Sequence, residues 1–267
     1  MKIMTVLEDK KKILKLFKNN VLGKAPDTES FNQRHDGKDG HWLEAQMGIA
    51  RNGDNAPDLF GFEMKNQTTS KTSFGDWSAD YYIFKKNPIY PSLNKETFLK
   101  IFGKPNMQKG GRLSWSGEPI PKINNWNNFG CILLVDDSNN ILIQYSYSKD
   151  LRQNKSFLVP IELQQENLIL VSWSASRMKN FVERKFNQNG WFKCLKDSSG
   201  SYCSIVFGEP MTFLNWIELV KQGIVFFDSG MYAGNSRPYS MWRASNIEWT
   251  KLGCEEFNST KLSTMDL

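Results

Sequence analysis

Hydrophobic positions recur with a helical period in several stretches of the chain. Residues 5–19 carry four apolar side chains on one stripe, which predicts an amphipathic helix: Val6, Ile13, Leu14 and Phe17. In residues 40–50, Leu43 and Met47 stand four positions apart, which predicts a second, shorter helix. Two further helices are predicted over residues 175–187 and 212–222, the second capped by Thr212 and ended by Gly223.

Short apolar runs bounded by turn-forming residues dominate the chain after Asp58. Two such runs enclose the polar segment Asp136–Asn140, and this arrangement predicts a β-hairpin. Further strands are predicted over residues 57–67, 78–84, 111–117, 168–173, 202–207, 224–227 and 240–244. Strands and helices mix without a regular β–α–β alternation, so we expect an α+β fold with a central mixed β-sheet flanked by helices.

The size and charge of the chain narrow the choice of partners. A length of 267 residues is enough for one large domain or for two lobes. The polar segment at residues 126–128 favours two lobes, formed by residues 1–125 and 126–267. A formal net charge of +6 favours an anionic partner such as nucleic acid or an acidic membrane surface.

The composition argues against several classes of protein. The sequence has no run of about 18 apolar residues and its start lacks the apolar core of a signal peptide, so we expect no membrane association and a cytoplasmic location. The four cysteines and two histidines lack the clustered spacing of a structural zinc site. Disulfides are possible, but the spacing of the cysteines fits buried free thiols in a reducing cell.

The segment PDLFGFEMK, residues 57–65, places acidic and basic side chains in a pattern suited to metal-dependent hydrolysis of phosphodiesters. Alternation along a strand would point Glu63 and Lys65 to one face. Asp58 lies upstream, and Gly61 permits a turn or bulge that brings the carboxylates of Asp58 and Glu63 within reach of one ion. Magnesium takes oxygen ligands, so these carboxylates and a backbone carbonyl would suffice.

Each of these groups would have a part in the reaction. A bound Mg²⁺ acts as a Lewis acid and makes a bound water nucleophilic. Lys65 would orient that water or neutralise charge, and Glu44 on the upstream helix would add a third acidic group near the ion. The spacing alone leaves a second interpretation open, in which the segment is a charged strand face exposed to solvent.

Residues 41–65, HWLEAQMGIARN…APDLFGFEMK, resemble the MutH/MvaI–BcnI group of PD-(D/E)xK nucleases. That group carries a Leu-Glu-x-x-x-Gly helix, a short loop, then Asp, a Gly-containing turn and Glu-Leu-Lys. In this sequence, Met64 replaces the leucine. Two later stretches are also similar to the BcnI branch. Phe102-Gly103 followed by Lys109-Gly110-Gly111-Arg112-Leu113 is similar to its KGGRL stretch. Phe227-Asp228 followed by Arg237-Pro238-Tyr239 to Arg243 resembles its DNA-reading region.

The resemblance implies a type II restriction endonuclease, in which a catalytic lobe and a recognition lobe form a DNA cleft. It implies Mg²⁺ as the cofactor, bound by Asp58, Glu63 and the backbone carbonyl of Met64. It also implies catalysis by Lys65 and a supporting role for Glu44. Enzymes of this type act as monomers on double-stranded DNA, at short sites of the CC-x-GG kind, and have a cognate DNA methyltransferase as a genetic partner.

The candidate DNA-binding residues have ordinary structural alternatives. The paired glycines would let backbone N–H groups approach a phosphate, or they form a basic turn between strands. The two C-terminal arginines would each fork onto a guanine, or they lie on a solvated surface loop. The candidates are Lys109, Gly110, Arg112, Arg237, Tyr239 and Arg243.

Two other functions are open at this point. A MutH-like DNA-nicking repair endonuclease would show weak activity alone and stimulation by a partner protein. A non-catalytic DNA-binding protein on a nuclease fold would show no magnesium-dependent turnover. The intact set of Asp58, Glu63 and Lys65 argues against the latter, because degenerate nucleases usually lose one member.

Overall fold

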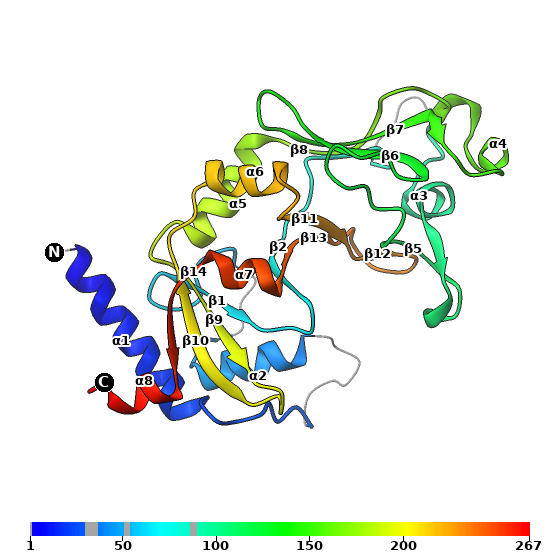
Figure 1. Cartoon of the computed structure of the whole chain (residues 1–267). Helices are drawn as coiled ribbons and strands as arrows, with labels where there is room; N and C mark the ends of the chain where they lie inside the picture. The colour runs from blue at the N-terminus through cyan, green and yellow to red at the C-terminus, as the bar shows by residue number, and fades with distance from the viewer. Residues whose placement is uncertain (1, 30–36, 51–53, 86–89) are drawn as a thin grey trace. The chain divides into compact units, whose positions relative to one another are not determined.

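The computed structural model describes residues 2–29, 37–50, 54–85 and 90–267 (Figure 1). The chain forms two compact units and passes between them four times. The first unit comprises Met1–Thr72, Phe181–Phe213 and Ser245–Leu267, and the second comprises Ser73–Asn180 and Leu214–Ala244. The lobe boundary expected at residues 125 and 126 therefore falls inside the second unit.

A four-stranded mixed sheet forms the centre of the first unit. Its strands, in spatial order, are β1 (Phe62–Asn66), β9 (Gly190–Lys196), β10 (Tyr202–Gly208) and β14 (Gly253–Asn258). β1 and β9 run parallel, whereas β9–β10 and β10–β14 are antiparallel. The register places Glu63 opposite Trp191 and Lys65 opposite Lys193. The expected mixed sheet is confirmed, and its parallel pair joins segments that are far apart in the sequence.

One face of this sheet is apolar and carries the core of the first unit. Helices α1 (Lys2–Asn20), α2 (Lys38–Gln46) and α8 (Ser259–Thr264) pack against it. The core cluster draws on these helices and on all four strands, and its members include Phe17, Leu43, Phe62, Phe192, Phe207, Phe257 and Leu262. Because successive side chains on a strand point to opposite faces, the residues between these apolar positions point to the other face.

That other face carries polar and charged side chains, among them Glu63 and Lys193. Helices α5 (Ala175–Phe186) and α7 (Asn246–Leu252) contribute residues beside it. The ring of Trp249 packs edge-on against Trp191, with 4.9 Å between ring centroids, and also lies 6.4 Å from the ring of Phe186. The end of α5 is thereby fixed next to the charged positions of β1 and β9.

Three sheets build the second unit. The strands of the four-stranded sheet are β3 (Tyr81–Tyr82), β8 (Leu168–Trp173), β7 (Ile141–Asp150) and β6 (Phe129–Val135). The first three-stranded sheet contains β11 (Phe226–Ser229), β13 (Ser240–Ser245) and β2 (Lys71–Asp76). The second contains β12 (Met231–Tyr232), β5 (Arg112–Trp115) and β4 (Lys104–Asn106). The helices are α3 (Lys95–Phe102), α4 (Lys155–Leu158), α6 (Phe213–Lys221) and the 3-10 turns Met107–Lys109 and Ile161–Leu163.

Tryptophans form the core beside β11 and β13. The rings of Trp173 and Trp216 each lie 5.3 Å from the ring of Trp242 in edge-to-face arrangements, and Phe227 lies 5.1 Å from Trp173. Such pairs add stability beyond the burial of their area. Burial alternates along both strands, so Asp228 lies on the less buried side of β11.

Most elements predicted from the sequence are present, with shifted ends. The helices over 5–19 and 175–187 and the hairpin of β6 and β7 are confirmed. The helix predicted over 40–50 ends earlier, because Gly48 adopts a positive φ of 75° two residues after Gln46. The strand predicted over 78–84 shrinks to the two residues of β3. The elements that the pattern did not reveal are α3, α4, α7, α8, β2, β4, β9, β12 and β14.

The structure also bears on the state of the cysteines and on membrane-spanning helices. The four cysteines are free thiols, as expected, but only Cys131 and Cys194 are buried; Cys203 is partly buried and Cys254 is exposed, so the expectation of burial is wrong for these two. Within the described part of the chain, no helix is both long enough and apolar enough to cross a membrane.

Candidate active site

A two-residue turn leads into β1. The N–H of Phe62 donates to the carbonyl of Leu59 at 2.9 Å, and the N–H of Leu59 donates to the carbonyl of Phe62 at 3.0 Å. The central residues Phe60 and Gly61 both have positive φ, 50° and 78°. This pattern is typical of the type I′ turn, whose two central residues both require positive φ. The turn expected at Gly61 is therefore confirmed.

Asn189, between α5 and β9, holds this turn. Its N–H donates to the carbonyl of Gly61 at 3.0 Å, and its Nδ2 donates to the carbonyl of Phe60 at 2.9 Å. A Cβ atom at position 61 would lie 2.8 Å from this Nδ2. Glycine is needed here both for the backbone conformation and for the close approach of Asn189.

The turn brings Asp58 back to the strand that carries Glu63. Oδ2 of Asp58 accepts a hydrogen bond from the N–H of Met64 at 2.9 Å. The negative charge of Asp58 also acts on Glu63, whose pKa it helps to raise. The structure thus brings together the two carboxylates that the sequence predicted to meet.

Glu63 and Lys65 form a buried ion pair on the polar face of the sheet. Nζ of Lys65 lies 2.7 Å from Oε1 of Glu63, and only 3% of the Glu63 side chain is exposed. The alternative interpretation of this segment as a solvent-exposed charged face is therefore wrong. The other oxygen of Glu63, Oε2, is buried, and no described residue forms a hydrogen bond with it.

A second lysine at Glu63 was not anticipated from the sequence. Nζ of Lys185, in the last turn of α5, lies 3.0 Å from Oε1 of Glu63. Lys185 follows the buried Met178 by seven positions, so it lies on the inner side of an amphipathic helix. A charged residue on the apolar stripe of this helix is the sequence signal that could have identified Lys185.

Burial controls the ionisation of this cluster. It raises the pKa of Glu63 to about 7, although the positive charges of Lys65 and Lys185 act in the opposite direction. Burial likewise lowers the pKa of Lys65, against the effect of Glu63. On the neighbouring strand, burial lowers the pKa of Lys193 to about 8. The site therefore penalises charge in the absence of a further counter-ion.

The oxygen atoms of Asp58 and Glu63 fit a hard divalent cation. An ionised carboxylate oxygen that is buried without a partner is costly, and Oε2 of Glu63 is such an atom. Among the residues that the structure describes, no three His, Cys, Asp or Glu side chains gather closely enough to hold a metal. Two carboxylates with waters completing the shell match the way Mg²⁺ is usually bound.

Glu44 does not join these carboxylates in a three-acid group. Its Oε2 lies 3.1 Å from Nδ1 of His41, three residues earlier on α2. Both side chains are about one-third exposed. The expectation that Glu44 adds a third acidic group at the ion is not met in this structure, because α2 presents its carboxylate to a histidine of the same helix.

The candidate phosphate-binding turn lies in the second unit. Lys109 and Gly110 are exposed at the end of a 3-10 turn, where Gly110 and Gly111 have φ of 66° and 77°. The guanidinium carbon of Arg112 lies 3.5 Å from the centre of the Tyr232 ring. This stacking orients Arg112.

Each candidate base-reading arginine is paired with an aspartate of the second unit. Arg237 lies 2.5 Å from Asp76 and stacks on Tyr239, whose ring centre is 4.4 Å away. Nε of Arg243 on β13 lies 3.0 Å from Oδ2 of Asp228 on β11. Both guanidinium groups thus lie beside a carboxylate, although Nε of Arg243 is buried and forms no hydrogen bond with a described residue.

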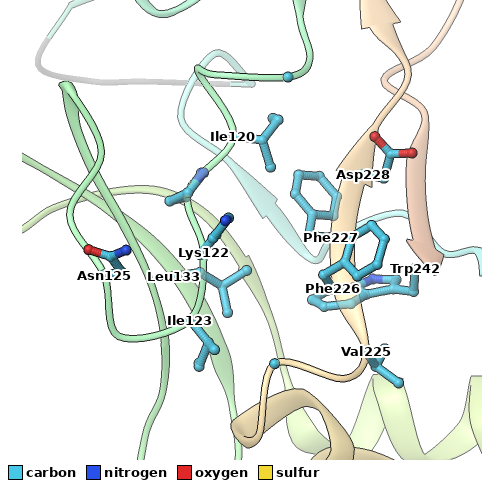
Figure 2. Close-up of a pocket in the computed structure, with 13 residues that line it drawn as sticks. Ile120, Lys122, Ile123, Asn125, Leu133, Val225, Phe226, Phe227, Asp228 and Trp242 are labelled. Carbon is cyan, nitrogen blue, oxygen red and sulfur yellow. The ribbon is translucent and has the colours of Figure 1, made fainter. Parts of the chain in front are cut away.

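Asp228 also borders a cavity of about 560 Å³ within the second unit. Figure 2 shows the loop that carries Ile120, Lys122 and Ile123 on one side of this cavity and β11 on the other. The lining is mainly apolar, and it includes none of the residues of the Asp58–Lys65 cluster. The cavity belongs to the unit that carries the candidate DNA-reading arginines.

Comparisons with known proteins identify the family of this chain. The family model described as LlaMI restriction endonuclease matches residues 21–257. The type II restriction enzyme ScrFI of Lactococcus lactis subsp. cremoris is 48% identical over 263 residues, covering 91% of this chain and 97% of that enzyme. Together these matches identify the family without reference to individual site residues.

Solved structures identify the fold. The restriction endonuclease MvaI in complex with its cognate DNA substrate superposes with a TM-score of 0.58 and 14% identity, covering 92% of this chain and 96% of that chain. MvaI in the absence of DNA gives a TM-score of 0.41 and 15% identity, covering 94% and 97%. The first match confirms the restriction-endonuclease-like fold. The chain belongs to the LlaMI restriction endonuclease family and is a type II, site-specific DNA endonuclease.

Proposed function

We propose that this endonuclease hydrolyses double-stranded DNA with Mg²⁺ bound by Asp58 and Glu63. The observation that carries the proposal is the buried Oε2 of Glu63, to which no described residue donates a hydrogen bond. A divalent cation would satisfy this oxygen and favour its ionised form. The backbone of Met64 supports the same arrangement. Its N–H points to Asp58, and the carbonyl of a strand residue points to the same side as its N–H.

The residues of the chain would then divide the work. Bound Mg²⁺ supplies Lewis-acid chemistry and lowers the pKa of a bound water. Lys65 is the proposed catalytic residue that orients the attacking water or neutralises charge on the phosphate, since it carries a positive charge beside the metal-binding carboxylate. Glu44, which pairs with His41, is proposed as a supporting residue outside the pair of ligands.

The two units are proposed to have different tasks. The first unit holds Asp58, Glu63 and Lys65 and would cleave the DNA. The second unit holds Arg237 and Arg243 and would read the site. Arginine is the usual bidentate partner of guanine, which favours a short recognition site of the CC-x-GG kind. The solved complex of MvaI with cognate DNA supports a duplex substrate.

The biological setting follows from this activity. The enzyme would act as a monomer in the cytoplasm, where foreign DNA arrives. A cognate DNA methyltransferase would protect the host genome at the same sites. These assignments follow from the activity of restriction enzymes as a class and are part of the proposal.

A digest of a mapped plasmid tests the proposal directly. The pure protein is incubated with Mg²⁺ or with EDTA, and the ends of the fragments are sequenced. We expect the wild type to give discrete Mg²⁺-dependent fragments whose ends share one short motif. The Asp58→Ala and Lys65→Ala variants should not cleave DNA, but each should still bind it. Cleavage that survives these substitutions would reject the assigned site, and nicks alone would favour a nicking endonuclease.

A further inference from the structure

Two lysines meet at one oxygen of Glu63. Nζ of Lys65 lies 2.7 Å from Oε1, and Nζ of Lys185 lies 3.0 Å from the same atom. Lys65 comes from β1, whereas Lys185 comes from the last turn of α5. Oε2 receives no hydrogen bond from the described residues. The carboxylate is therefore held from one side only.

This asymmetry decides which oxygen is available to a ligand. The terminal torsion of a glutamate is broad and roughly two-fold, so the torsion itself does not distinguish the two oxygens. A charge-assisted hydrogen bond from Lys65 and an ion pair with Lys185 both engage Oε1. Oε2 of Glu63 is the oxygen left for a metal ion.

The double pairing resolves a conflict between two tasks of Lys65. In the proposed function Lys65 acts on the water or the phosphate, yet its Nζ is engaged with Oε1 of Glu63. If Lys65 were the only cation there, its movement would leave a buried carboxylate oxygen without a positive partner, which is strongly unfavourable. Lys185 occupies the same oxygen and would remain in place.

Packing holds Lys185 at this position. Its side chain is only 15% exposed, and a lysine is rarely so buried unless it is paired. The next residue, Phe186, is fully buried, and its ring centre lies 5.3 Å from Nζ of Lys65. Nδ2 of Asn55 donates to the carbonyl of Phe181 at 2.9 Å, which ties α5 to the loop before Asp58.

We infer that Lys185 is a positioning residue of this endonuclease, which keeps Oε1 of Glu63 neutralised so that Oε2 remains a metal ligand and Lys65 is released for the reaction. The inference rests on the proposed function and deepens it. Lys185 forms no bond to the DNA in this account and transfers no proton.

The test compares Lys185→Met, which keeps an unbranched side chain one heavy atom shorter and removes its charge, with Lys185→Arg, which keeps the charge. Arg184→Met is the matched control, because it removes one positive charge from an exposed position of the same helix turn. Three quantities are measured for the full chain: the single-turnover cleavage rate, the Kd for DNA and, by calorimetry without DNA, the Kd for Mn²⁺. Thermal unfolding checks that each variant folds.

We expect Lys185→Met to slow single-turnover cleavage by about tenfold to a hundredfold and to weaken Mn²⁺ binding by about tenfold, as for other residues that orient a metal ligand. The Kd for DNA should stay near the wild-type value. Lys185→Arg should restore most of the rate, and Arg184→Met should behave as wild type. If Lys185→Met fails to fold, Lys185→Gln, which retains a hydrogen-bond donor, takes its place.

Two outcomes would overturn the inference. An unchanged cleavage rate in Lys185→Met would show that Lys65 needs no substitute at Oε1. Tighter Mn²⁺ binding would show that Lys185 acts only as a repelling charge near the metal. Asp58→Asn and Glu63→Gln are assayed alongside. Wild-type cleavage by these two would reject the proposed metal site itself, whereas their inactivity beside a fully active Lys185→Met would reject only the role of Lys185.

Discussion

Oδ2 of Asp58 accepts a hydrogen bond from the backbone N–H of Met64 at 2.9 Å. This bond closes a loop that starts before the turn at Phe60 and Gly61 and ends on the strand after it. The position of one carboxylate therefore depends on the backbone conformation of the turn. A change in the turn should disturb the proposed metal site even though neither proposed ligand is altered.

Gly61→Ala tests this dependence. Alanine must adopt the left-handed conformation, which costs about 1–2 kcal/mol, and its Cβ would push against Nδ2 of Asn189. We expect a fall in the free energy of unfolding of that size, measured with urea, and a loss of at least about tenfold in single-turnover cleavage, because small misplacements of reacting groups are costly.

Gly200→Ala is the matched control for the turn. Gly200 also has a positive φ, 85°, but a Cβ atom there would meet no atom within 4 Å. This variant should lose a similar amount of stability and keep the wild-type cleavage rate. Equal loss of activity in both variants would mean that the turn at Gly61 matters only for stability.

The ionisation of Glu63 predicts a pH-dependent cost to folding. Burial raises its pKa from the ordinary value of 4.5 to about 7, so the folded state retains a proton that the unfolded state releases. The contribution of Glu63 to stability is therefore full below pH 4.5 and is lost as the pH rises to about 7, a loss of about 3 kcal/mol. Glutamine at this position cannot ionise and lacks this loss.

Thermal unfolding of the wild type and Glu63→Gln between pH 4.5 and 8 measures this effect. We expect the Tm of the variant to rise relative to that of the wild type across this range and to level off above about pH 7. Addition of Mg²⁺ at pH 8 should stabilise the wild type and not the variant, since only the wild type offers the carboxylate ligand. If the Tm of the wild type and of Glu63→Gln changes with pH in parallel, and Mg²⁺ shifts both equally, Glu63 is neither the titrating group nor a metal ligand.

The sequence predicted the local geometry of the proposed metal site better than the arrangement around it. Asp58, Glu63 and the turn at Gly61 lie within a few residues of each other, so local alternation and glycine chemistry were enough to bring them together. Lys185 reaches the site through the pairing of β1 with β9, a contact between distant segments that local periodicity does not encode.

The division into units escaped prediction for a similar reason. The chain returns to the first unit at Phe181 and again at Ser245, inside or beside elements whose local pattern is continuous. β9 and β14 were missed because their residues alternate polar and apolar only in part, and their strand character comes from pairing with β10. The pairing of Glu44 with His41 likewise depends on side-chain conformations within α2.

The position of Glu44 predicts an order of effects among the acidic residues. Asp58 is hydrogen-bonded to the strand that carries Glu63, whereas Glu44 is paired with His41 and is one-third exposed. Glu44→Gln should therefore reduce single-turnover cleavage by less than Asp58→Asn does under the same Mg²⁺ concentration. A loss in Glu44→Gln as large as that in Asp58→Asn would show that Glu44 is itself a ligand in the DNA-bound enzyme.

The arginines and lysines of the second unit should differ in what they contribute to DNA binding. Nε of Arg243 lies 3.0 Å from Oδ2 of Asp228 on the neighbouring strand, whereas Lys109 is exposed on a glycine turn suited to phosphate. Arg243→Ala should cost about 1–3 kcal/mol for the cognate site and little for a scrambled one. Lys109→Ala should weaken both equally and reduce the slope of log Kd against log salt by about one.

Gel-shift titrations at several salt concentrations, without divalent cations, measure both quantities. Asp228→Asn is the control for Arg243, because it loosens the guanidinium without removing it and should give an intermediate loss of specificity. If Arg243→Ala weakens cognate and scrambled DNA by the same factor, Arg243 binds the backbone and the reading of bases lies elsewhere. If Lys109→Ala changes only the cognate Kd, the assignment of the glycine turn to phosphate binding is wrong.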